Sequence, residues 1–373
     1  MVIKVSKPEI NVREKISELD KPSGTAGQAM LAAETPQEQF NLISAGRRNL
    51  IFNGDMRVAQ RGTGAFTANG DRPVDRWQMI SNTNDFTTTQ SSTVPVGKGF
   101  TKSVKIQPTA TKSPSSSTYA RIGYSIEGYD GASLCWGTSG AKSATISFWV
   151  RASVTGIYSI GVKNTAANRS ICLEYTIDSV DTWEYKTITF SGVTDGTWEQ
   201  TNSRFCYIDV WQAGQGSQTS TIGTWQNQNT NMSSNQVNLF TSTSNTFYIT
   251  GFQMEVGKVA TPFEHRSYGE ELALCQRYYQ KVPSNDYIYD HCVFHYGGDF
   301  YASHTFMQPM RANPSVTIAT QGYYYEAGAA YSHGSITVRH ITPVALNFYA
   351  STNGGTSGYA GGVYFKYTAD AEL

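Results

Sequence analysis

Apolar and polar residues alternate in several short segments between residues 51 and 265. Ile146, Phe148 and Val150 alternate within ATISFWVRA, and TITF at 187–190 and FYI at 247–249 repeat the pattern. Loops rich in Gly, Asn and Ser separate these segments. A period of two residues is typical of strands with one buried face. We therefore predict that residues 51–265 form an antiparallel β-sandwich.

The pattern changes after Pro262. Ser267 is followed three residues later by Glu270, which is the spacing of a helical capping box. Leu and Tyr residues then recur at three- and four-residue spacings until Pro283, which cannot continue a helix. We predict a linker helix over residues 266–283.

Residues 284–373 are predicted to form a small C-terminal β domain. Twelve of the 23 tyrosines lie here, together with only nine charged residues. Tyr323, Tyr324 and Tyr325 are consecutive, so in a strand at least one ring faces opposite to the others. Tyrosine gives contact area with one polar end, which suits recognition. These three residues are our leading candidates for ligand binding.

Residues 1–50 contain 13 charged residues and a single aromatic one, Phe40. Such a segment cannot bury a core of its own. Two interpretations remain: a disordered leader, or an extended and partly helical arm that orders against a partner. Pro36 within Thr35–Glu38 suggests a helix start.

Composition limits the function. Charged residues are 16% of the 373, and 29 basic residues balance 29 acidic ones. Zero net charge argues against nucleic acid or an anionic membrane as the partner. The chain lacks an apolar run of membrane-spanning length and the apolar core of a signal peptide. Its five scattered cysteines indicate reduced, mostly buried thiols.

We find no catalytic motif and expect no enzyme activity and no cofactor. Asp195, Glu199 and Asp209 have no motif around them that would indicate a carboxylate pair. His291 and His295 would share one face of a strand, with His304 further on, but a metal site needs more ligands. We favour hydrogen bonding for these histidines.

The tryptophans divide into two groups. Trp77, Trp149 and Trp183 lie in strand-like patterns and are predicted to belong to the core. Trp136 and Trp225 lie in loops rich in Gly, Ser and Asn, where they serve either as loop anchors or as sugar-stacking platforms.

Three stretches carry a resemblance to a protein class: GFQMEVGKVATPFEHRSYGEELALCQRYYQK at 251–281, residues 10–63, and FMQPMRANPSVTI at 306–318. They resemble tail fibres and other receptor-binding structural proteins of tailed bacteriophages, notably those of marine bacteria and cyanobacteria. The resemblance implies a homotrimer, a virion-attachment arm at residues 1–50, and host adsorption through a surface polysaccharide or lipopolysaccharide. It also implies synthesis in the host cytoplasm and a place in the virion.

Other phrases, namely NLIFNGDM, DRW, SFWVRA, TWEYKTITF and FYITGFQME, resemble jelly-roll carbohydrate-binding modules. Asn53 and Asp55 match the first half of the calcium site of those modules. Thr250-Gly251 stands where they carry an acidic residue. We therefore expect no bound metal.

Two other functions remain open. One is a secreted or cell-surface carbohydrate-binding module without enzyme activity, and the other is a polysaccharide depolymerase. The receptor, and attachment to the tail or to the capsid, are left open by the sequence.

Overall fold

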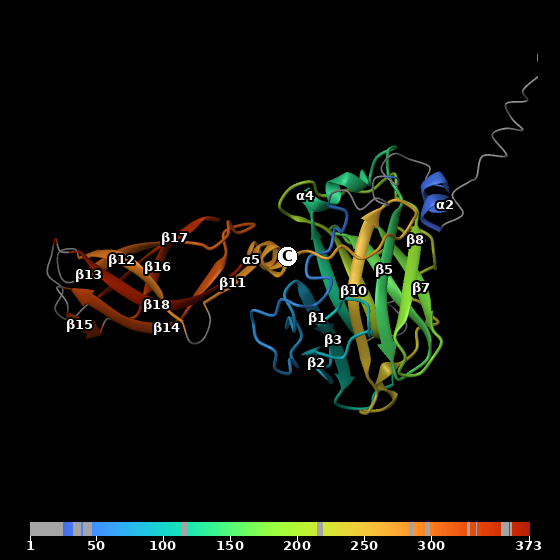
Figure 1. Ribbon diagram of the computed structural model, residues 1–373, viewed down its shortest axis with the longest axis horizontal. Coiled ribbons are helices and arrows are strands. Elements are labelled where there is room, and N and C mark those ends of the chain that lie inside the picture. The colour runs from blue at the N-terminus through green and yellow to red at the C-terminus, as the bar shows by residue number, and fades with distance from the viewer. Residues whose placement is uncertain are drawn as a thin grey trace, which may run out of the picture.

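The computed structural model describes residues 25–32, 39, 47–113, 118–214, 219–282, 286–294, 299–326, 329–332, 334–351, 358 and 360–373. Of residues 25, 26, 30, 31, 319–326 and 329–332, it describes the backbone alone. The described chain forms two β domains that are joined by one helix. They lie end to end along the long axis of the molecule (Figure 1).

The first domain is a sandwich of two five-stranded antiparallel sheets, which confirms the predicted fold class. One sheet has the order β1 (Trp77–Ser81), β4 (Ala120–Glu127), β9 (Arg204–Ala213), β6 (Gly156–Asn164), β7 (Ser170–Ile177). The other has the order β2 (Phe86–Ser91), β3 (Ser103–Pro108), β10 (Phe247–Val256), β5 (Ala144–Ala152), β8 (Glu184–Phe190). Short helical turns α4 (Gly128–Gly131), η1 (Ala132–Leu134) and η3 (Leu239–Thr241) lie between strands.

Strand alternation builds the core of the sandwich. Ile146, Phe148 and Val150 of β5 are fully buried, as is Trp77 of β1. Trp149 was predicted to belong to the core, and this is wrong: it is only half-buried. Successive side chains point to opposite faces of a strand, so Trp149 faces outward wherever Phe148 faces inward.

Residues 219–238, between β9 and β10, form a long loop that lies against the outer face of the sheet that contains β9 and β6. Asn231 donates from Nδ2 to Oδ2 of Asp209 at 2.9 Å, and Ser159 donates from its backbone N to Oε1 of Gln236 at 2.8 Å. Gly161 permits this approach, since a Cβ there would lie 2.2 Å from Cγ of Asn231. The loop therefore occupies this face.

The linker helix α5 (Tyr268–Gln276) begins where it was predicted. Oγ of Ser267 accepts a hydrogen bond from the backbone N of Glu270 at 3.2 Å, which confirms the N-cap. The helix is shorter than predicted, because it ends at Gln276 and Tyr279–Lys281 form β11, which pairs with β18. The apolar positions that suggested a longer helix thus contribute to a sheet.

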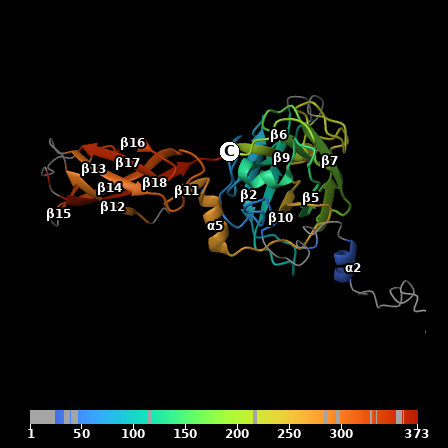
Figure 2. The ribbon, with the colours of Figure 1, turned by 90° about the horizontal axis from the view of Figure 1, so that it is seen from above.

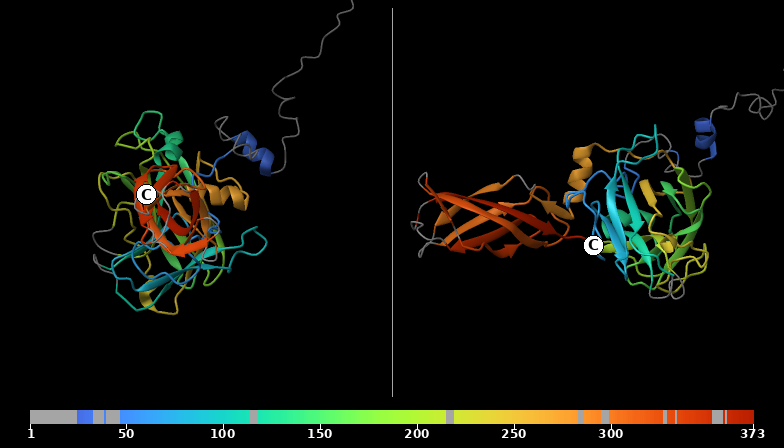
Figure 3. Two further views of the ribbon diagram at one scale, coloured as in Figure 1. Left: turned by 90° about the vertical axis from the view of Figure 1, so that its left-hand side faces the viewer. Right: turned by 90° about the horizontal axis from the view of Figure 1, so that it is seen from below.

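The C-terminal domain is one eight-stranded antiparallel sheet that curls around its own core (Figure 3). Seven of its strands have the order β15 (Ala329–Ser332), β14 (Ser315–Glu326), β18 (Ala360–Asp370), β12 (Ile288–Phe294), β13 (Asp299–Thr305), β17 (Ala345–Ser351), β16 (Thr337–Ile341), and the eighth, β11, pairs with β18 outside this order. Phe300, Phe348, Phe365 and Tyr367 are buried at its centre.

The N-terminal segment is described only in part. Helix α2 (Thr25–Ala32) lies on the side of the sandwich away from the C-terminal domain (Figures 1 and 2). The predicted helix start at residues 35–38 lies outside the described residues. Backbone N–H groups of Arg48 and Asn49 each donate to Oε2 of Glu264 at 2.8 Å, so these residues already pack with the sandwich.

A buried charge cluster joins the two domains. The guanidinium of Arg76 forms an ion pair with the carboxylate of Glu372, and its Cζ lies 3.5 Å from the centre of the Tyr278 ring. Arg61 and Arg72 each approach the same carboxylate to 3.5 Å. Burial opposes ionisation of Glu372, but Arg76, Arg72 and Arg61 outweigh it and hold the pKa of this carboxyl below its usual value.

A second set of contacts lies beside this cluster. Glu127 accepts hydrogen bonds from Nη2 of Arg277 at 2.6 Å and from the hydroxyl of Tyr278. Arg311 donates from Nη1 to the carbonyl of Asn202 at 2.6 Å, and Asn202 donates back from Nδ2 to the carbonyl of Arg311 at 2.9 Å. The two domains are therefore fixed to each other at several points.

The structure also bears on the predictions about the cysteines and about membrane-spanning segments. Cys172, Cys206, Cys275 and Cys292 are buried, as predicted. No helix in the described residues is both long enough and apolar enough to cross a membrane.

We predict that Glu372→Gln lowers the free energy of unfolding by about 3 kcal/mol, because it leaves buried guanidinium groups without their shared carboxylate. Glu270→Gln is the matched control, since Glu270 pairs with Arg47 at an exposed site, where an ion pair contributes about 0–1 kcal/mol. Chemical denaturation measures both variants. Equal losses would contradict the structural role of the buried cluster.

Candidate functional site

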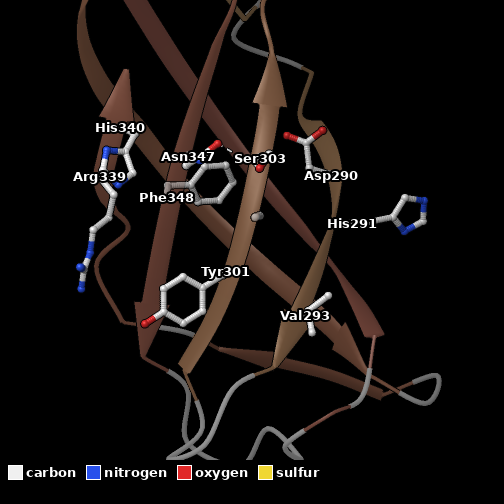
Figure 4. A pocket seen from close by; sticks show the side chains of 10 residues that line it. Asp290, His291, Val293, Tyr301, Ser303, Arg339, His340, Asn347 and Phe348 are labelled. Atoms are coloured by element: carbon white, nitrogen blue, oxygen red, sulfur yellow. Dashed lines mark hydrogen bonds between the residues drawn. The ribbon is translucent and has the colours of Figure 1, made fainter. Parts of the chain in front are cut away.

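A groove of about 600 Å³ lies on the C-terminal domain, across strands β12, β13, β17 and β16 (Figure 4). Strand alternation produces it: Phe300 and Ala302 of β13 face the core, so Tyr301 and Ser303 face outward. The residues that line it are Asp290, His291, Val293, Tyr301, Ala302, Ser303, Arg339, His340, Asn347 and Phe348.

The floor of the groove is polar. Ser303 and Asn347 are directly opposite each other on β13 and β17, and Oγ of Ser303 donates to Oδ1 of Asn347 at 3.0 Å. Both side chains are exposed. A hydroxyl and a carboxamide together offer donors and acceptors, which is what a neutral ligand with several hydroxyl groups requires.

An aromatic stack borders this floor. Tyr301 and Tyr349 also pair across β13 and β17, with ring centroids 5.8 Å apart and planes inclined by 22°. Cζ of Arg339 lies 4.5 Å from the centre of the Tyr349 ring. Because Tyr301 is 42% exposed, part of its ring is available for stacking on a ligand.

A second aromatic pair lies across β12 and β18. Tyr289 is exposed, and its ring centroid lies 4.8 Å from that of Tyr364 and 5.5 Å from that of His291. A Cβ at Gly362 would lie 2.1 Å from the hydroxyl of Tyr289. Glycine at this position therefore allows the Tyr289 ring to lie close against β18.

A buried network supports one end of the groove. Nδ1 of His304 lies 2.9 Å from Oδ2 of Asp290, and Nε2 lies 3.1 Å from the hydroxyl of Tyr367. Burial raises the pKa of Tyr367, so its hydroxyl stays protonated. This network fixes the side chain of Asp290 at the groove.

His304 has hydrogen-bond partners, as predicted, and lies in different surroundings from His291. His304 is buried among the aromatic rings of the core, whereas His291 is exposed, and His295 lies outside the described residues. Within the described ranges, no group of three or more His, Cys, Asp or Glu side chains could hold a metal ion.

Asn53 and Asp55 each have protein partners. Asn53 donates from Nδ2 to the carbonyls of Val58 at 2.8 Å and Asp75 at 2.9 Å, and its Oδ1 accepts from the backbone N of Val58. Asp55 forms an ion pair with Arg57. The side chain of Asn53 therefore stabilises a turn through these hydrogen bonds, and the carboxylate of Asp55 is occupied by the guanidinium of Arg57.

The tyrosine triplet lies on another part of the domain. Tyr323, Tyr324 and Tyr325 belong to β14, which β18 and β12 separate from β13. Their side chains lie outside what the structure describes. Their role in binding stays a prediction.

The interpretation of Trp136 as a sugar platform is wrong. Its side chain is 2% exposed, Nε1 donates to the carbonyl of Lys142 at 2.8 Å, and its ring packs against Trp198 and Phe205. It is a loop anchor, which was the alternative. A ring enclosed in this way has no free face for a sugar.

Trp225 anchors its loop as well. Its Nε1 donates to the carbonyl of Ser191 at 2.8 Å, and its ring meets Trp136 with centroids 5.3 Å apart. The side chain is half-buried. A contribution of Trp225 to glycan binding stays a prediction.

The sequence analysis missed four residues of the groove: Tyr301, Ser303, Arg339 and Asn347. The alternation in DFYASHTF contained a signal for the first two, since inward Phe300 and Ala302 imply outward neighbours. The contributions of β16 and β17 depend on strand order, which the alternation pattern does not contain.

No protein-family model matches this chain, and no curated protein matches it. Among solved structures it resembles the enzymatically active domain of tailspike protein 4 of bacteriophage CBA120, with 13% identity and a TM-score of 0.31. That match covers 56% of this chain, which spans 21% of the length of the tailspike chain.

Two further matches are shorter proteins. One is a putative sugar-binding protein from Bacteroides thetaiotaomicron, with 11% identity, a TM-score of 0.33 and coverage of 56% of this chain and 100% of that one. The other is TmCBM61 in complex with β-1,4-galactotriose, with 11% identity, a TM-score of 0.29 and coverage of 56% and 99%.

Proposed function

We propose that this protein is a structural fibre or spike protein of a phage particle and that its C-terminal domain binds a host-surface glycan. The observation that carries the glycan part is the groove in which polar Ser303 and Asn347 lie beside the stacked rings of Tyr301 and Tyr349. The resemblance of residues 251–281 and 306–318 to phage fibre proteins supports the structural part.

The groove suits a saccharide for a physical reason. A sugar ring has an apolar face of C–H groups and a rim of hydroxyls, so it stacks on Tyr301 while its hydroxyls bond to Ser303 and Asn347. Arg339 and His340 are exposed at the opposite side of the groove from His291 (Figure 4). They supply further donors to the same ligand.

The N-terminal segment is proposed to attach the protein to other virion proteins. Helix α2 and the C-terminal domain lie on different sides of the sandwich, an arrangement that supports attachment at one end and receptor contact at the other. The protein is made in the host cytoplasm and incorporated into the particle. We propose no enzyme activity; a free carbohydrate-binding protein and a depolymerase are the alternatives.

We predict that the pair Tyr301→Ala and Tyr349→Ala weakens binding to host cells at least about tenfold. Loss of an aromatic platform costs about 1–3 kcal/mol per ring by analogy with base stacking, and 1.4 kcal/mol is a factor of ten. A quantitative cell-binding assay with purified full-length protein measures the change, after circular dichroism has verified folding.

The control for this prediction is the pair Tyr129→Ala and Tyr268→Ala, which removes two exposed rings from the sandwich and the linker helix. Unchanged binding by the groove variant would reject the C-terminal groove. In that case, the same binding assay is applied to two further variants, which test the competing sites. One combines Tyr323→Ala with Tyr325→Ala, and the other carries Trp225→Ala alone. Release of reducing ends from host envelope extract would favour the depolymerase alternative.

We predict a homotrimer in solution. The C-terminal domain exposes large side chains outside the groove, among them Tyr287 and Tyr289, and cyclic association would cover part of this surface. Light scattering after size exclusion is expected to give about three times the chain mass of 41.0 kDa. A monomer at micromolar concentration contradicts this prediction.

We predict that deletion of residues 1–46 leaves both β domains folded and abolishes incorporation into particles. The deletion ends there because Arg48 and Asn49 bond to Glu264, so a longer one would damage the sandwich. Immunoblotting of purified particles measures incorporation, and the thermal unfolding curve of the truncated protein is the folding control. Truncated protein found in particles would reject the attachment role.

A further inference from the structure

A second groove, of about 450 Å³, lies on the outer face of the sandwich sheet that contains β5, β8 and β10. The long loop described above lies over part of the other sheet. The residues that line the groove are Lys98, Phe100, Trp149, Tyr185, Gly251, Ala260, Thr261, Pro262, Phe263 and His265.

An irregularity in β10 shapes the floor of this groove. The pairing of β10 with β5 shifts register between Thr250 and Gln253, and Gly251 within this bulge has φ +62°. A Cβ at Gly251 would lie 2.5 Å from Cζ of Phe100. Glycine therefore supplies both the left-handed backbone and the space in which the Phe100 ring rests on the strand.

Aromatic rings form two sides of the groove. Phe263 meets Phe100 edge to face with centroids 5.1 Å apart, and His265 lies 5.0 Å from Phe263. Trp149 and Tyr185, which pair across β5 and β8, have centroids 5.4 Å apart. Tyr185 is 45% exposed and Trp149 half-buried, so these two rings form a platform that is open to ligand.

The charge in the groove is positive. Lys98 is exposed, and its Nζ lies 5.5 Å from the centre of the Trp149 ring. Partial burial lowers the pKa of His265, which is therefore mostly neutral at pH 7 and able to donate or accept a hydrogen bond. None of the described residues that line the groove is Asp or Glu. The carboxylate of Asp55 acts on His265, but it is paired with Arg57, so an anionic group on a ligand would meet the charge of Lys98.

We propose that this groove is a second glycan-binding site, and that it takes a sugar unit with a carboxylate substituent. The apolar face of the sugar stacks on Trp149 and Tyr185, and the carboxylate lies beside the ammonium group of Lys98. The proposal shares the ligand class of the proposed function, a glycan, but concerns a different domain and different residues.

The test uses the full-length chain with Tyr301→Ala and Tyr349→Ala, so that the C-terminal groove is removed from the measurement. The probes are an α-1,4-linked oligogalacturonate and an α-1,4-linked galacto-oligosaccharide of equal length, which differ only in the carboxylate at C6. Isothermal titration calorimetry is expected to show tighter binding of the oligogalacturonate, and weaker binding at high salt because the Lys98 contact is screened.

Three variants in this background decide the outcome. Trp149→Ala and Tyr185→Ala are each expected to weaken binding of the oligogalacturonate about tenfold. Lys98→Gln is expected to reduce the preference for oligogalacturonate over the galacto-oligosaccharide. Tyr129→Ala, an exposed ring away from the groove, is the matched control and should bind like the background protein. Tyr185→Ala and Lys98→Gln alter exposed side chains, so they keep the test valid if Trp149→Ala fails to fold.

Absence of oligogalacturonate binding by the background protein would overturn the proposal. So would equal affinities for the Tyr185→Ala and Tyr129→Ala variants, or an unchanged preference between the two probes in Lys98→Gln. These results are independent of the C-terminal groove. Failure of the proposed function would appear instead as unchanged host-cell binding after the Tyr301→Ala and Tyr349→Ala pair.

Discussion

The buried ion pair between Arg76 and Glu372 is the constraint on which the arrangement of the two domains depends. Arg76 is charged and almost fully enclosed, between the carboxylate of Glu372 and the face of Tyr278. An unpaired charge in this position would cost several kcal/mol, so the sandwich is stabilised when residue 372 returns to it from the C-terminal sheet. Strand β11, which follows Tyr278 directly, pairs with β18 in that sheet. Both ends of the C-terminal domain are therefore held against the sandwich.

This constraint explains why α5 does not behave as a free stalk. Glu271 of the helix accepts a hydrogen bond from the backbone N of Asn53, and Arg266 donates from Nη2 to the carbonyl of Asn49 at 2.8 Å. The first residues of the sandwich, the helix and the domain junction thus share one network. The orientation of the C-terminal groove relative to the sandwich follows from these contacts, because rotation of the domain would break several of them together.

The sequence predicted the parts that depend on local patterns. Alternation located the strands, and Ser267 located the start of α5, because both signals lie within a few neighbouring residues. The end of the helix was not predictable in the same way, since residues 279–281 leave it to pair with β18, about 90 residues later in the chain. The role of Trp136 was left open for a similar reason: Gly and Ser neighbours indicated a loop, but the rings of Trp198 and Phe205 that enclose it come from distant segments.

The error about Trp149 has a different origin, and Trp149 is one of the residues that line the groove on the sandwich. An aromatic residue within a strand was assigned to the core by its type, although its neighbours Phe148 and Val150 already occupied the inward positions. The same alternation of side chains along a strand directs Tyr301 and Ser303 outward, because Phe300 and Ala302 face inward. Outward residues of strands thus form part of each groove, and the inward residues of the same strands form a core.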